Sequence, residues 1–520
     1  MKLLRLTMVV CGALLILTLA VGIFKWTGYG DNLLVDDELT DAQYKTLIGI
    51  DDKHTKTLPN SIILNTRQLL KDEKFELLNQ AIADAQKDVE SDISTERNLL
   101  VRFWAFEIND ENYGKLIDKW KQATPNEYQP FLAKAKYNTA KGWRLRGSKW
   151  ASETSDEQMD AMQHHYLLAL EELKTALSIN DHSLIAYHQL IAITRILGSP
   201  KESAKVLIKG LDKFPASYYL RSRYLNYLLP RWGGSYEQMQ SFIDDAQQSV
   251  SLNPRLAILQ NSILLDKADN HRRTRAYNLA EQLYVEALKY GDDHALFYDR
   301  GINNFKRKKY SDAIENYTQA IKIYAENADF YYRRSKAYSE IKQWDNAVDD
   351  LIRANLLQPN DKSTQEMIKW VTNTLSFDAY QANKTGNTKQ AIEYTNIGLR
   401  LMPNNPKLYN RRAQALVSMN QRTLATKDSK KSIELDPNNI DYYLTLDWVL
   451  AKQNDWNQII EYWDKFIKLH PNNGRAYVER GGAYYRSGDL ETAIQNAKKS
   501  ADLGNPEGKE AYLKFKDRLW

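Results

Sequence analysis

Apolar residues along most of the chain recur at the spacing of one helical face. In an early segment, Leu70, Leu78 and Ile82 follow this spacing. Residues 61–290 show little of the alternating pattern that marks a strand, and turn clusters such as Gly198-Ser199-Pro200 separate the long amphipathic segments. The pattern predicts an all-α chain.

The N-terminus has a different pattern. Residues 6–24 form a run of 19 without a charge, after Lys2 and Arg5 and before Lys25-Trp26. Such a run is long enough to span a bilayer as a helix, and a Trp beside a Lys suits the membrane interface. A secretory signal peptide is the alternative, with Thr18-Leu19-Ala20 or Ala20-Val21-Gly22 as its cleavage site.

Either reading sends the bulk of the chain across the membrane, because the positive charges stay on the inner side. We expect a single-pass protein of a bacterial inner membrane, with residues 1–26 as the anchor and the bulk of the chain in the periplasm. The alternative is secretion after cleavage. Residues 27–60 are polar and in places acidic, and we expect them to form a tether. The only cysteine, Cys11, lies in the apolar run, so the exported part has no thiol for a disulfide or a metal site.

Between residues 294 and 505 the sequence repeats itself with a period of 34. Residue pairs seven places apart recur at this interval or after one longer gap: Ala313 and Ala320, Ala347 and Ala354, Ala391 and Gly398, Ala425 and Ser432, Ile459 and Phe466, Ala493 and Ser500. Pro403, Pro437 and Pro471 keep the same count, and each opens a Pro-Asn-Asn turn. Proline lacks the N–H that the next helical bond requires, so each turn should end a helix.

This pattern resembles the tetratricopeptide repeat. The resemblance implies stacked pairs of antiparallel helices, in which small residues let paired helices approach and aromatic residues fill the gaps between pairs. We therefore expect an all-α solenoid of helix pairs over residues 294–505, closed by an amphipathic capping helix over residues 506–520. Residues 61–290 should form a helical domain with degenerate repeats, since Ala169 and Ser203 keep the interval of 34.

Part of this helical domain resembles a bacterial domain family of unknown function found in exported proteins. The resemblance covers roughly residues 63–246. It rests on the segments Gly142-Trp143-Arg144-Leu145-Arg146-Gly147 and Pro230-Arg231-Trp232-Gly233-Gly234-Ser235, and on residues 159–169 between them. It implies no known activity.

The segment from Arg231 to Ser235 is open to two interpretations. It can line a pocket, with Arg231 for an anion, Trp232 for a stacked ring, and Gly233 and Gly234 for close approach of the backbone. Alternatively, the glycines form a tight loop between helices, Ser235 caps the next helix, and Trp232 packs into the core. We favour the second interpretation.

The tetratricopeptide resemblance also implies where a ligand would bind. In such arrays the first helix of each pair lines a concave groove, and its places two, five, six, nine and twelve meet ligands. The peptide-binding residues expected from this register are Tyr298, Tyr332, Arg333, Lys336, Asn410, Arg411 and Trp448, together with Asp299, Ile302, Phe305, Gln414, Glu479 and Tyr485. The alternative is a solvated inner face. The Lys and Asn pattern that clamps a chaperone's C-terminal carboxylate is not matched.

Arginine recurs at place seven of the first helix, as Arg300, Arg334, Arg412 and Arg480. Because these residues follow the period of the repeat, we expect them to serve the fold and not a ligand.

Composition and the search for reactive motifs add exclusions. The chain has 71 basic and 66 acidic residues, a net charge of +5, which is too small an excess to indicate nucleic-acid binding. Adjacent His164 and His165 would point about 100° apart on a helix, which is poor geometry for a metal. No metalloprotease, P-loop or serine-hydrolase motif occurs. We predict a membrane-anchored scaffold that binds another protein through the groove, without enzymatic activity, cofactor or metal. The alternative is a small-molecule-binding or enzymatic N-terminal domain centred on Arg231 and Trp232.

Overall fold

Every regular element that the computed structural model describes is helical. The structure describes residues 61–147 and 153–517, and within them it contains α-helices and short 3-10 helices but no strand. No helix in these residues has both the length and the apolar character needed to cross a membrane. The predicted membrane or signal helix over residues 6–24 and the predicted tether over residues 27–60 lie outside the described residues.

The N-terminal part, up to residue 290, has its largest core between α3 and α11, and smaller core clusters follow it. Its α-helices are α3 (Ile62–Lys71), α4 (Phe75–Ser91), α5 (Glu96–Trp104), α6 (Glu111–Ala123), α7 (Gln129–Arg146), α8 (Asp156–Ile179), α9 (Leu184–Ile196), α10 (Pro200–Lys213), α11 (Tyr218–Leu225), α12 (Tyr236–Gln247), α13 (Asn261–Arg273) and α14 (Tyr277–Ala287). Short 3-10 helices η5 (Asn226–Leu228), η6 (Pro230–Trp232) and η7 (Pro254–Gln260) connect some of them. The core from α3 to α11 contains the fully buried rings of Phe103, Phe106 and Trp120.

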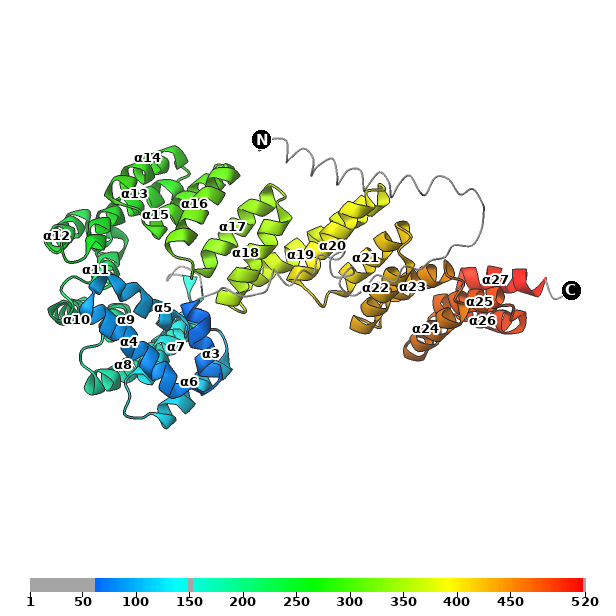
Figure 1. Ribbon diagram of the computed structural model, residues 1–520, viewed down its shortest axis with the longest axis horizontal. Helices are drawn as coiled ribbons and strands as arrows, with labels where there is room; N and C mark the ends of the chain where they lie inside the picture. The colour runs from blue at the N-terminus through cyan, green and yellow to red at the C-terminus, as the bar shows by residue number, and fades with distance from the viewer. Residues whose placement is uncertain (1–60, 148–152, 518–520) are drawn as a thin grey trace, which may run out of the picture. The chain divides into compact units, whose positions relative to one another are not determined.

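The C-terminal part is a row of helix pairs (Figure 1). The pairs are α15 (His294–Lys306) with α16 (Tyr310–Ile323), α17 (Ala328–Glu340) with α18 (Trp344–Leu357), α19 (Lys362–Lys384) with α20 (Thr388–Leu401), α21 (Pro406–Ser418) with α22 (Arg422–Leu435), α23 (Ile440–Ala451) with α24 (Trp456–Leu469), and α25 (Gly474–Ser487) with α26 (Leu490–Asp502). A last helix, α27 (Pro506–Lys516), packs against α25 and α26. Helix α19 is the longest first helix of a pair, with 23 residues.

The two helices of most pairs are joined by the same turn. One to three residues after the first helix ends, the backbone adopts a positive φ. The residues at this position are Lys308, Lys342, Gly386, Asn420, Asn454 and Gly488 in the repeats, and Glu73, Gly198 and Arg275 after α3, α9 and α13. The N-terminal part therefore uses the connection of the repeats, although its sequence keeps their period only loosely.

The Pro-Asn-Asn turns have two roles. The preceding helices end at Leu401, Leu435 and Leu469, before each proline. The second asparagine of each turn then caps the next helix: the side chains of Asn405, Asn439 and Asn473 accept hydrogen bonds from backbone N–H groups of α21, α23 and α25. Such caps satisfy N–H groups that have no partner inside the helix.

Three of the four arginines at place seven hold the two helices of a pair together, whereas Arg300 of α15 donates to Glu281 of α14, at 2.8 Å. Arg412 donates from Nε and Nη2 to both oxygens of Asp428 at 2.7 and 2.9 Å, and each side chain is 1% exposed. Arg334 makes the same two bonds to Asp350. Arg480 donates to Asn496 at 2.9 Å. All four arginines predicted to serve the fold thus bind side chains of neighbouring helices.

The first described helix is fixed to the repeats by polar contacts. The Glu326 carboxylate, between α16 and α17, accepts hydrogen bonds from the Ser61 hydroxyl at 2.8 Å and from the Ile62 N–H at 2.6 Å. Arg67 in α3 donates to the carbonyl of Leu357, the last residue of α18, at 2.7 Å, and to the carbonyl of Ala105 at 2.9 Å. Residues far apart in the sequence are thus joined around α3.

Candidate peptide-binding groove

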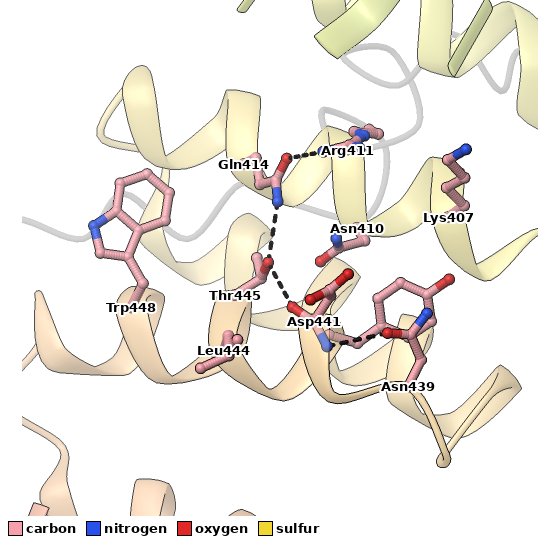
Figure 2. Close-up of a pocket in the computed structure, with 10 residues that line it drawn as sticks. Lys407, Asn410, Arg411, Gln414, Asn439, Asp441, Leu444, Thr445 and Trp448 are labelled. Atoms are coloured by element: carbon pink, nitrogen blue, oxygen red, sulfur yellow. Dashed lines mark hydrogen bonds between the residues drawn. The ribbon is translucent and has the colours of Figure 1, made fainter. Parts of the chain in front are cut away.

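A hollow of about 480 Å³ lies between α21 and α23, the first helices of two consecutive pairs. It is lined by Lys407, Asn410, Arg411, Gln414, Asn439, Asp441, Tyr442, Leu444, Thr445 and Trp448 (Figure 2). The repeat produces this hollow because α21 and α23 each begin after an asparagine cap. Equivalent faces of α21 and α23 therefore line it. Three residues predicted from the register, Asn410, Arg411 and Trp448, line the hollow together with Gln414.

Asn410, like Arg411 at its Nε, carries a buried polar atom that lacks a hydrogen-bond partner among the described residues. Its side chain is 4% exposed, and its Oδ1 has no hydrogen-bond partner among the described residues. Figure 2 shows its amide pointing from α21 towards α23. A buried amide oxygen without a partner costs free energy.

A chain of hydrogen bonds connects the two walls of the hollow. Arg411 donates to the Gln414 Oε1 at 2.9 Å, and the Gln414 amide donates to the Thr445 hydroxyl at 3.2 Å. The Thr445 hydroxyl donates to the Asp441 carbonyl at 3.1 Å. The Trp448 side chain is 42% exposed at the other end of the hollow. The polar floor is therefore ordered, and an aromatic ring remains open to a partner.

Aromatic residues that the sequence analysis did not select extend this surface along α19. Phe377 is 60% exposed and Tyr380 is 41% exposed, and the Arg411 guanidinium lies 4.5 Å from the centre of the Tyr380 ring. The register could have found them: counting back from Ala391, which occupies the same place as Ala425, puts Phe377 at place six and Tyr380 at place nine.

The other predicted residues form a separate cluster on α15 and α17. Tyr298 donates to the Asp329 carboxylate, and the Arg333 Nε lies 3.5 Å from the same side chain. Lys336 Nζ lies 5.7 Å from the centre of the Tyr332 ring. None of these residues lines the hollow between α21 and α23. Their polar groups are engaged mainly with one another.

Asp299 belongs to this second cluster. Burial raises the pKa of its carboxyl to about 7, the charge of Arg272 opposes the shift, and the charge of Asp269 adds to it. This side of the groove therefore contains an acid that changes its charge near neutral pH.

The other residues predicted to bind a ligand differ in their contacts and exposure. Ile302 is buried, and Phe305 packs against Tyr310. Glu479 forms an ion pair with Arg475. Tyr485 stacks on Phe515 of α27, with 4.7 Å between the ring centres, so the last helix covers it.

Most residues of the segment from Arg231 to Ser235 have a structural role. Arg231 forms an ion pair with Asp266, and the Ser235 hydroxyl accepts a hydrogen bond from the Gln238 N–H at 3.2 Å. A Cβ on Gly234 would lie 2.1 Å from the Leu228 carbonyl oxygen, so only glycine fits.

Trp232 is the residue of this segment for which the expected structural role fails. Its side chain is 57% exposed, so the expectation that it packs into the core is wrong. The 3-10 helix η6 ends at this residue, and Gly233 follows it in the left-handed conformation.

Models of two families match the sequence. The model described as a domain of unknown function, DUF4034, matches residues 63–212 and 202–249. Models of the tetratricopeptide repeat match residues 298–359, 406–439 and 448–507. The chain carries a DUF4034 domain and tetratricopeptide repeats. Both resemblances found in the sequence are confirmed.

Several solved structures are similar to the chain at low identity. The tetratricopeptide domain of P58(IPK) is 16% identical, with 68% of this chain and 93% of that chain covered and a TM-score of 0.24. A fragment of yeast Sti1 in a complex with pHSP90 is 14% identical, covers 46% and 98%, and has a TM-score of 0.21. A tetratricopeptide repeat protein from Parabacteroides merdae ATCC 43184 is 15% identical, covers 49% and 98%, and has a TM-score of 0.24. TM-scores this low do not support any conclusion about function. A comparison with curated proteins gives no match.

Proposed function

We propose that the protein is a scaffold whose tetratricopeptide repeats bind a segment of another protein between α19 and α23. The unpartnered Oδ1 of Asn410 carries this proposal, because Asn410 lines a hollow between two first helices and this oxygen has no hydrogen-bond partner among the described residues. A peptide backbone offers the complementary N–H and C=O groups. Binding would satisfy a group that the free protein leaves unsatisfied.

The side chains around Asn410 indicate which peptides fit. Phe377, Tyr380 and Trp448 are exposed aromatic rings, which bury large apolar area with little loss of rotamer entropy. Lys407 and Arg411 add positive charge to the lining of the hollow, and Asp441 is its one acidic residue. We therefore expect an extended segment with apolar side chains and a net negative charge.

The substitution Asn410→Leu tests this role directly. Leucine has a similar size and no unsatisfied polar group, so stability should stay equal or rise. Capture of the partner should fall about tenfold or more, because the backbone hydrogen bonds are lost. The assay is photo-crosslinking in intact cells from probes at Phe377 and Lys407, followed by mass spectrometry.

A probe at Ile208 on α10 serves as the control, since this side chain is 68% exposed and lies far from the repeats in sequence. A partner captured from Phe377 and Lys407 but not from Ile208 supports the groove. Unchanged capture by the Asn410→Leu variant, or clear destabilisation of it, would show that Asn410 serves the fold.

We also propose that residues 6–24 attach the protein to a bacterial inner membrane, with the bulk of the chain in the periplasm. The uncharged run of 19 residues after Lys2 and Arg5 supports this. Fractionation with alkaline carbonate would leave an anchored protein in the membrane pellet. Release into the soluble fraction, with a mature N-terminus after residue 20 or residue 22, would instead establish secretion.

A further inference from the structure

Helix α19 is longer than the first helix of any other pair in the repeats. It has 23 residues, whereas α15, α17, α21, α23 and α25 have 12 to 14. In the register that puts Phe377 at place six, place one is Thr372, and residues 362–371 precede it. These residues form additional turns of the same helix that the repeat does not require. The extension therefore needs an explanation outside the repeat.

One face of α19 carries three large aromatic side chains that are open to solvent. Trp370 is 49% exposed, Phe377 is 60% exposed and Tyr380 is 41% exposed. With three exposed polar residues they form a row, the α19 stripe: Glu366, Trp370, Asn373, Phe377, Tyr380 and Lys384. Successive members of the stripe are four or three residues apart, which is the spacing along the seam of a two-stranded coiled coil.

The opposite face of α19 is used by the fold. Ile368, Val371 and Leu375 are buried and share a core cluster with Trp344 and Leu351 of α18. Helix α19 also packs against α20 and α21. The α19 stripe is therefore the face that packing within the chain leaves open. Removing its three aromatic rings from water would be favourable.

The α19 stripe is complementary to itself when two copies of the helix run antiparallel. Its members lie in pairs at equal distances from Leu375: Asn373 and Phe377 are two residues away, Trp370 and Tyr380 are five away, and Glu366 and Lys384 are nine away. A two-fold axis at the level of Leu375 would place Glu366 opposite Lys384 of the partner subunit, and Trp370 opposite the partner's Tyr380. A two-fold interface requires such a match, because the same patch must complement itself.

The charges at the two ends of the stripe decide the direction of pairing. A parallel pair would bring Glu366 against Glu366 of the partner subunit and Lys384 against the partner's Lys384, and like charges repel. An antiparallel pair brings opposite charges together at both ends. Within the chain, Glu366 lies 3.9 Å from the Nζ of Lys362, and both side chains are largely exposed. Such a contact contributes little, so Glu366 can pair across an interface.

We propose that the α19 stripe is a self-association surface, through which two copies of the protein pair with their α19 helices antiparallel. The second copy would cover Phe377 and Tyr380, which also border the proposed peptide groove. A second copy and a peptide would therefore compete for these rings. The proposal does not rest on that groove, because Asn410 is not part of the stripe. Asn410→Leu should leave the pairing unchanged, so the two proposals fail separately.

The first test is the mass of the full-length protein in detergent, measured by sedimentation velocity between about 1 and 100 µM. We expect an equilibrium of monomer and dimer with a Kd on the order of 10 µM. Trp370→Ala should weaken the dimer about tenfold or more, because each dimer loses two buried rings. Trp143→Ala is the matched control. That ring is 53% exposed but lies on α7, so its loss should not change the Kd.

Exchanging the charges tests the antiparallel pairing. Glu366→Lys and Lys384→Glu should each weaken the dimer about tenfold, because each brings like charges together at both ends. The variant with both substitutions should regain the wild-type Kd. A mixture of the two single variants should form a heterodimer in preference to either homodimer. Glu315→Lys makes the same change in net charge at an exposed site of α16 and should have no effect.

Three results would overturn the proposal. A monomer at all concentrations up to about 100 µM would leave the stripe to a different partner. A dimer that neither Trp370→Ala nor the charge variants weaken would have its interface elsewhere, residues 6–24 included. Two weakened single variants whose double variant is not restored would exclude the antiparallel register. Circular dichroism of each variant separates lost pairing from lost folding, and the charge variants decide the matter if Trp370→Ala does not fold.

Discussion

Individual residues of the repeat turns carry backbone strain. Lys342 has a φ of 58° in the turn between α17 and α18, in the left-handed region that residues with a Cβ rarely adopt. Its side chain is exposed. Lys342→Gly should therefore raise the free energy of unfolding by about 0.5–1 kcal/mol. Asn454→Gly, at the same position of another pair with a φ of 56°, should gain less, because asparagine tolerates this region. Urea unfolding measures both; a loss of stability in Lys342→Gly would contradict the reasoning.

A second residue makes stability depend on pH. Burial raises the pKa of Asp447 from 3.8 to about 6, and its carboxylate accepts a hydrogen bond from the Trp463 Nε1 at 2.7 Å. The folded state binds this proton more tightly than the unfolded state, so protonation of Asp447 stabilises the fold. This contribution to the free energy of unfolding is present at low pH and is lost as the pH rises through 6. Asp447→Asn keeps an acceptor for Trp463 and removes the charge. It should be more stable than the wild type by about 1–2 kcal/mol at pH 8, and the difference should shrink at pH 5. A difference that does not change between these pH values would contradict the assignment.

At the scale of helix pairs, the buried ion pair between Arg412 and Asp428 can be tested by substitution. Removing only Arg412 leaves the charge of Asp428 in a site that is 1% exposed, so Arg412→Met should cost about 3–5 kcal/mol. Arg412→Met with Asp428→Leu should cost less, because no unpaired charge remains. Arg480→Met is the comparison, since its ion-pair partner Asp464 is 51% exposed and the loss should be smaller. Denaturant unfolding of the four proteins decides this; a double variant as unstable as Arg412→Met would refute it.

The helix pairs also show which features of the fold and of the groove could be predicted from the sequence. The period of 34 placed the helix pairs, and it assigned Arg412 to the fold and Asn410 to the groove. It could not show that Asn410 lacks a hydrogen-bond partner, because that depends on the neighbouring helix. Phe377 was missed because α19 interrupts the period with a longer helix. The core position expected for Trp232 was wrong because aromatic character alone does not reveal which way a short 3-10 turn points a side chain.

For the molecule as a whole, the contacts around α3 suggest that the DUF4034 domain and the first repeats unfold together. Glu326 accepts hydrogen bonds from Ser61 and Ile62 at the N-terminus of α3, where a negative charge is also favoured by the helix dipole. Arg67 binds the end of α18. Nearby apolar residues from α3, α5, α17 and α18 share one core cluster. The two parts are therefore coupled through a charged contact and an apolar one.

Glu326→Ala removes the charged contact and leaves the apolar one. We expect a loss of about 1–2 kcal/mol and faster amide hydrogen exchange in α3, since its first N–H groups lose their acceptor. Glu315→Ala, which removes an exposed carboxylate from the neighbouring helix α16, should leave this exchange unchanged. If the two parts fold as one unit, exchange should also rise in α17 and α18 of the Glu326→Ala variant. Faster exchange confined to α3 would show instead that this helix opens alone, and that the DUF4034 domain and the repeats are stable without each other.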